Sequence, residues 1–235
     1  MSDGDAFVQE RGWSPTRRNF VIGAVFLLAV CDYGSETKLR HRLVVDVGTP
    51  AGVVSGAAVR ETLVQRAPRW APGLQVTFEG RGEAVAIDLP NGQTLFALLG
   101  TTYFPDAFIR LPIELFVQQA EYERTGESDT SQRVKQLMRD QPSAPVTGDN
   151  RPRLVRFRDI SDPSTMEEVD PDQLSDAFGS GYYLQGMTIS ITTDRVTTGI
   201  GDRLPWLRDL PPGRVGQPAD SFTGSLAPSD LAVGT

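Results

Sequence analysis

The chain has 235 residues, of which 39% are hydrophobic and 23% charged, a composition typical of a folded globular protein. Its formal net charge of -7 argues against the concentrated basic surface that nucleic-acid binding requires, so we expect no nucleic-acid partner. The chain has one cysteine, Cys31, and one histidine, His41, which excludes an intramolecular disulfide and a zinc site built from several of these residues. We predict no metal and no cofactor.

Residues 1–30 have the pattern of an export signal. An apolar run at residues 20–30 follows the pair Arg17 and Arg18. As a helix this run would rise about 16 Å, roughly half of a ~30 Å hydrocarbon core, so it suits the apolar region of a signal peptide better than a membrane span. The arginine pair also resembles a twin-arginine signal, and the sequence leaves the export route open.

Cys31 stands where such a signal would be cleaved. The segment Leu28-Ala29-Val30-Cys31 resembles the lipobox of bacterial lipoproteins, although Val30 replaces the small residue usual there. The resemblance implies cleavage before Cys31 and lipid attachment to its thiol; the alternative is an incidental cysteine beside an ordinary cleavage site. Asp32 resembles the residue that retains such lipoproteins in the inner membrane.

Alternating apolar residues predict antiparallel strands in the first hundred residues. Residues 39–47 form one strand with His41 on its apolar face, and turn-forming residues 48–52 lead to a returning strand at 53–64. A further strand is predicted at 74–79.

The dipeptide Asn91-Gly92 predicts a two-residue type I′ turn between two more strands. The pairs that this turn implies are Leu89–Thr94, Ile87–Phe96 and Val85–Leu98.

The middle of the chain predicts a helical hairpin. An amphipathic helix is expected to begin near Pro112, and a second helix is expected to be capped by Ser128 or Asp129. The inward side chains are predicted to be Ile113, Phe116, Val117 and Ala120 in the first helix and Val134, Leu137 and Met138 in the second. Residues 141–152 read as a loop or linker.

The last third predicts a return to strands. Residues 153–160 form a strand that places Arg156 and Arg158 on its polar face, and residues 187–191 form another. Asp170, followed by proline, is the predicted N-cap of a short third helix.

These elements predict an α+β fold, mainly antiparallel β-sheet with β-hairpins, a helical hairpin and a short third helix. We expect a single domain over residues 31–208, with a sub-boundary at 141–152 as the alternative. The proline-, glycine- and serine-rich residues 209–235 are predicted to form a disordered tail.

Four groups of polar residues could carry chemistry, and each also has a structural explanation. His41 could act as a general base or be a core residue, and Glu114 could be a catalytic carboxylate or lie on a helix surface. Arg156 and Arg158 could bind an anion or pair with acidic neighbours. An acidic stretch comprises Asp159, Asp162, Glu167, Glu168, Asp170 and Asp172. Its spacing differs from that of a calcium-binding loop, which favours solvated turns. We assign no catalytic residue.

Three segments resemble an uncharacterised group of exported, lipoprotein-like proteobacterial proteins. They are residues 39–52, residues 82–99, and residues 196–200 together with 203–207. The resemblance covers roughly residues 31–208. It implies export and a single fold, and it implies no activity and no catalytic residue.

We therefore expect a lipid-anchored protein on the periplasmic side of the bacterial cell envelope, held at the inner membrane. The favoured role is non-enzymatic binding or scaffolding of an envelope protein or ligand. The alternatives are an envelope hydrolase that works through carboxylates and a periplasmic small-ligand carrier.

Overall fold

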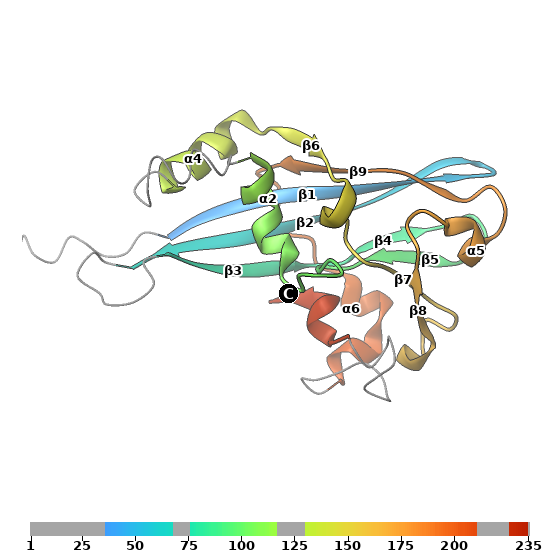
Figure 1. Cartoon of the computed structure of the whole chain (residues 1–235). Coiled ribbons are helices and arrows are strands. Elements are labelled where there is room, and N and C mark those ends of the chain that lie inside the picture. Colours follow the sequence, from blue (N-terminus) through green and yellow to red (C-terminus); the bar gives the residue numbers. More distant parts are fainter. Residues whose placement is uncertain (1–35, 68–75, 117–129, 211–225, 235) are drawn as a thin grey trace, which may run out of the picture.

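The computed structural model describes residues 36–67, 76–116, 130–210 and 226–234 (Figure 1). Two antiparallel sheets and several helices make up this part of the chain, so the predicted α+β class with mainly antiparallel sheet is confirmed. The export signal at residues 1–30 and the lipid-attachment residue Cys31 lie outside the described residues.

A large sheet of six strands has the order β10-β3-β2-β1-β9-β6. Its strands are β1 (Glu36–Thr49), β2 (Gly52–Arg66), β3 (Val76–Glu83), β6 (Ser143–Pro145), β9 (Tyr183–Ile191) and β10 (Ala232–Val233). β1 and β2 pair antiparallel along their full length and form the long ribbon that crosses Figure 1. The alternating apolar residues of β1 are buried on one face of the sheet, as its sequence predicts.

A small sheet of four strands has the order β4-β5-β7-β8. Its strands are β4 (Val85–Asp88), β5 (Thr94–Ala97), β7 (Leu154–Phe157) and β8 (Met166–Val169). Only Ala84 separates β3 from β4, so the chain passes at this residue from the large sheet into the small one. The sheets meet closely at Gly56 of β2, where a Cβ atom would lie 2.5 Å from the carbonyl oxygen of Ala86.

The strand pairs predicted around the Asn-Gly turn are wrong by one residue. The observed pairs are Asp88–Thr94, Ile87–Leu95, Ala86–Phe96 and Val85–Ala97. The Gly92 amide donates to the carbonyl of Leu89 at 2.9 Å, and the Leu89 amide donates to the carbonyl of Gln93 at 2.8 Å. With Gly92 at φ +81, this is the geometry of a three-residue loop with a bulge. The additional loop residue moves every side chain of β5 to the opposite face.

Two helices, α2 (Ala107–Phe116) and α4 (Thr130–Asp140), lie against the large sheet. α2 begins before the predicted start, so that Pro112 lies inside the helix. It crosses β3 at Gly80, where a Cβ atom would lie 2.3 Å from the Phe108 ring. α4 buries Val134 and Leu137 as predicted. The predicted inward residues Val117 and Ala120 and the predicted caps Ser128 and Asp129 lie outside the described residues.

Residues 141–152 are part of the fold and not a linker. Ser143–Pro145 pair with β9 as the edge strand β6, and Val146 is buried in the main core. A short 3-10 helix, η1 (Gly148–Asn150), follows. The alternative of a sub-boundary at 141–152 stays a prediction.

The third helix, α5 (Leu174–Phe178), buries Leu174 and Phe178 against the main core. Its N-cap is Gln173, so the predicted capping role of Asp170 is wrong. Asp170 instead accepts the Asp172 amide at 2.8 Å, which closes a local turn before the helix begins. The remaining short helices are η2 (Pro163–Thr165), α6 (Ile200–Arg203), η3 (Pro205–Arg208) and η5 (Pro228–Asp230).

The prediction of a disordered tail at 209–235 is wrong for residues 226–234. Leu226 and Leu231 are buried in a second core cluster on the far face of the small sheet, and β10 pairs with the end of β3. The Ala84 amide donates to the Leu231 carbonyl at 2.7 Å. The spacing of the two leucines follows neither the strand period nor the helix period, so the sequence does not reveal that they pack on this face of the small sheet.

Candidate functional site

His41 lies inside the core. It is 1% exposed and sits between Leu39 and Leu43 on the buried face of β1, directly opposite Arg60 of β2. Its Nδ1 atom is buried and has no hydrogen-bond partner among the described residues. Burial, together with the positive charge of Arg60, lowers the pKa of His41 to about 3. At neutral pH the imidazole is therefore uncharged and closed off from solvent, which favours the structural interpretation over that of a general base.

Arg60 is the largest fully buried side chain among the described residues. Its Nε atom donates to the carbonyl of Glu83 at 3.1 Å, and a terminal nitrogen donates to the carbonyls of Ala97 and Leu98 at 3.3 and 3.2 Å. Burial lowers the pKa of Arg60 to about 9, and the nearby negative charge of Glu83 opposes this shift. Gly82 makes room for the arginine, because a Cβ atom there would lie 2.8 Å from its Cγ. Arg60 thereby ties β2 to the end of β3 and to β5.

Glu83, at the end of β3, is 4% exposed and carries the buried negative charge beside Arg60. One carboxylate oxygen, Oε2, accepts the amides of Gly199 and Ile200, each at 2.9 Å. These two bonds attach the segment before α6 to the junction between the sheets. Within the described part of the chain, the second oxygen, Oε1, accepts no hydrogen bond.

A cleft of about 430 Å³ opens beside Glu83. Its lining residues are Glu83, Thr198, Gly199, Ile200, Gly201, Asp202, Leu207, Arg208, Pro228, Ala232 and Gly234. At the rim, Arg208 and Asp202 form an ion pair at 2.6 Å. The site brings together β3, the segment that leads into α6 and η3, and the strand β10. Sequence reasoning missed it because these segments lie far apart in the chain.

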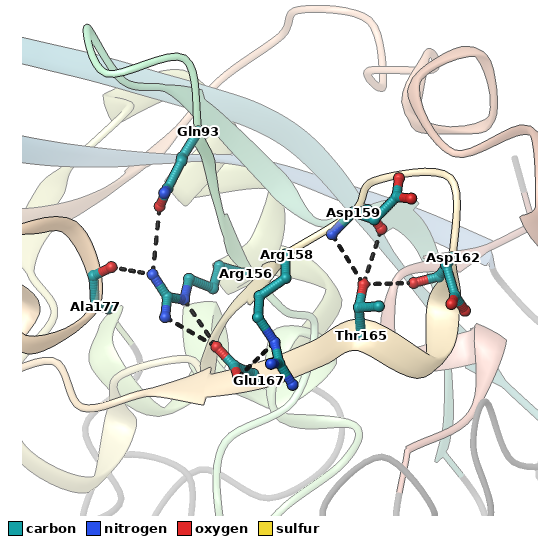
Figure 2. A network of polar contacts seen from close by, with 8 residues as sticks. All are labelled: Gln93, Arg156, Arg158, Asp159, Asp162, Thr165, Glu167 and Ala177. Carbon is teal, nitrogen blue, oxygen red and sulfur yellow. Dashed lines mark hydrogen bonds and ion pairs between the residues drawn. The ribbon is translucent and has the colours of Figure 1, made fainter.

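Arg156 and Arg158 project from β7 and the turn after it toward the neighbouring strand β8, as Figure 2 shows. Both form ion pairs with Glu167, at 2.9 Å each. Arg156 also donates to the side chain of Gln93 at 3.4 Å and to the carbonyl of Ala177, and its guanidinium lies over the Phe178 ring. These contacts favour the interpretation that the arginines pair with acidic neighbours over that of an anion site.

The acidic side chains at 159–172 close local turns or form ion pairs. Asp159 and Asp162 accept the amides of Ser161 and Ser164 at 2.9 Å, and the Thr165 hydroxyl joins the two turns (Figure 2). Glu168 pairs with Arg153 at 3.2 Å, and Asp172 pairs with Arg151 at 2.7 Å. No group of three or more potential metal ligands lies together in the described ranges.

Glu114 is exposed on α2. It borders a hollow of about 20 Å³ with Arg110, Asn150 and residues of the loop before α2. None of the acidic residues at 159–172 lines this hollow, so Glu114 and that stretch do not form a carboxylate pair there.

The loop before α2 exposes two adjacent aromatic side chains. Tyr103 is 66% exposed and Phe104 58%. The buried Thr101 holds the loop, because its hydroxyl accepts the amides of both aromatic residues at 3.3 and 3.1 Å while its own amide donates to the Phe104 carbonyl at 2.9 Å. At Gly100 a Cβ atom would lie 2.8 Å from the Cα of Pro105, so the chain folds back tightly on itself. Sequence reasoning did not single out this loop.

No helix among the described residues is both long and apolar enough to cross a membrane. In comparisons with known proteins, the chain matches no family model, no curated protein and no solved structure.

Proposed function

We propose that this protein is a lipid-anchored, non-enzymatic binding protein of the bacterial cell envelope. The apolar run before Cys31 and the lipobox resemblance support export and a lipid at Cys31, with the folded part on the periplasmic side of the inner membrane. The resemblance to the group of exported proteobacterial proteins supports the same compartment. The exposed pair Tyr103 and Phe104 is the observation that supports a binding role.

A pair of exposed aromatic side chains on a loop whose backbone is held by hydrogen bonds is well suited to protein recognition. Aromatic residues dominate binding energy at protein interfaces because they bury a large area with few rotatable bonds. The bonds from Thr101 hold the loop in place before binding, which lowers the entropy that binding would cost. We favour a protein partner over an anionic membrane surface, because the net charge of -7 would be repelled by acidic headgroups.

Photo-crosslinking tests the proposed surface. With a photo-reactive amino acid at position 103 in living cells, we expect one dominant adduct with an envelope protein. Tyr183 is the matched control, because it is a comparably exposed tyrosine on β9. Binding of the purified partner should weaken about 30-fold in the double variant Tyr103→Ser, Phe104→Ser, as expected when an interface hot spot is lost. Equal adducts at positions 103 and 183, or unchanged partner affinity in the double variant, would contradict the proposed binding role of the aromatic loop.

The lipid anchor is tested separately by metabolic labelling with a radioactive fatty acid. We expect label in the native chain and none in Cys31→Ser, because the cysteine thiol is the proposed attachment point. The variant should also leave the membrane fraction, since two or three acyl chains provide the stable attachment. Equal labelling of the two chains would rule out lipid attachment at Cys31, although export could still occur.

A further inference from the structure

The cleft beside Glu83 has the features of a small-molecule site. Its volume of about 430 Å³ is within the range typical of ligand pockets. One part of its lining is apolar, from Ile200, Leu207, Pro228 and Ala232. The polar part includes the exposed Thr198 and the Arg208–Asp202 pair at the rim. The cleft therefore offers an apolar surface with a few directed polar groups.

Glu83 gives the cleft a directed hydrogen-bond acceptor. The side chain is almost completely buried and is fixed in place by the Gly199 and Ile200 amides on Oε2. Oε1 accepts no hydrogen bond among the described residues and is not one of their buried unpaired atoms, so it is open to the cleft that Glu83 lines. A ligand that donates a hydrogen bond would satisfy this oxygen.

Among the described residues the charges around the cleft balance, which favours a neutral hydrogen-bond donor over a cationic one. The negative charge of Glu83 is opposed by the buried Arg60, and Arg208 is paired with Asp202. Arg203, which also lies near Glu83, is bound by Asp88 at 2.7 and 2.9 Å. A cation would find no spare negative charge on the described residues of the site, whereas a neutral donor would not disturb this balance.

We propose that this cleft binds a small neutral saccharide. A sugar hydroxyl donates to Glu83 Oε1, and a second hydroxyl accepts from Arg208, whose guanidinium has more N–H groups than its bond to Asp202 uses. The C–H face of the ring lies against the half-buried Leu207 and Pro228. The site is separate from the aromatic loop, so it does not depend on the proposed protein partner.

The test is calorimetric titration of the detergent-solubilised full chain with glucose, N-acetylglucosamine, maltose and trehalose. Choline and acetate are the charged comparison probes. We expect at least one saccharide to bind with a Kd of about 1 mM or lower and neither charged probe to bind.

Two variants locate the binding. In Glu83→Gln, the amide oxygen still accepts the Gly199 and Ile200 amides, while the amide nitrogen replaces the free acceptor with a donor. In Thr198→Trp, an indole ring at an exposed position fills the cleft without removing a hydrogen bond shown for Thr198. We expect each variant to weaken saccharide binding at least tenfold. In Glu83→Gln a sugar hydroxyl loses its acceptor, and in Thr198→Trp the indole occupies the space of the sugar.

Matched controls are Glu114→Gln, which removes an exposed carboxylate elsewhere, and Tyr103→Ser in the aromatic loop; both should bind saccharide as the native chain does. The proposal is overturned if no saccharide binds below about 10 mM, if choline or acetate binds as well as the sugars, or if Thr198→Trp keeps native affinity while folded.

Discussion

Replacement of Arg60 by methionine is expected to lower the free energy of unfolding by about 3–5 kcal/mol. Methionine has a similar unbranched shape but cannot donate hydrogen bonds. The carbonyls of Glu83, Ala97 and Leu98 would each lose a donor, and the Glu83 carboxylate would lose the positive charge that lies near it. Both losses occur where water cannot compensate them. Urea denaturation, followed by tryptophan fluorescence, would measure the effect.

Arg42→Met is the matched control for this experiment. Arg42 is also on the large sheet, but its ion pair with Asp194 is at the surface, where such pairs contribute at most about 1 kcal/mol. A second variant, Arg60→Lys, keeps the positive charge but lacks the guanidinium geometry that reaches all three carbonyls. Its loss of unfolding free energy should lie between those of Arg42→Met and Arg60→Met. If Arg60→Met and Arg42→Met destabilise equally, the buried hydrogen bonds of Arg60 do not contribute as the structure implies.

The second large effect is a loss of stability in mild acid that depends on His41. Its pKa is about 3 in the folded protein, below the ordinary value of 6.5, because the site is buried and faces Arg60. Between these two values the unfolded chain binds a proton that the folded protein does not. The contribution of His41 is therefore fully present above pH 6.5 and is lost as the pH falls toward 3. It amounts to about 2 kcal/mol between pH 7 and pH 5.

The measurement is the free energy of unfolding at pH 7.5, 6.5, 5.5 and 5.0 for the native chain and for His41→Leu. Since His41 is the chain's only histidine, no other histidine titrates in this window. The native chain should lose stability steadily below pH 6.5, whereas the leucine variant should change little until the carboxylates titrate at lower pH. Parallel curves for the two chains would show that the imidazole is not held neutral in the core.

The regular elements could be predicted from the sequence because their apolar residues repeat with the period of a strand or helix. The burial of Leu39, Leu43, Val134 and Leu137 follows directly from such repeats. The register of β4 and β5 could not be predicted, because β5 is apolar and buried on both faces and alternation does not distinguish them. The length of the loop between the two strands sets their register, and Asn-Gly is compatible with both two- and three-residue loops.

The candidate sites were harder to predict because they depend on contacts between distant segments. Nothing local to Glu83 indicates that it binds the amides of Gly199 and Ile200 or that β10 pairs beside it. Charged side chains are ordinarily solvated, so the burial of Arg60 and Glu83 contradicts the usual preference of these residues. The acidic stretch at 159–172 was a simpler case, since its aspartates have the spacing of local turns.

The chain passes at Ala84 directly from β3 of the large sheet into β4 of the small sheet, and this connection affects how the protein unfolds. Fraying of β3 removes the support of β4, and loss of β4 uncovers the face of β2 at Gly56. Neither sheet is then an independent cooperative unit, so amides in both should exchange with solvent through the same global opening rather than through separate local ones. We therefore expect the two sheets to unfold together under mechanical or chemical stress, and a protease to cleave between them only after this global opening.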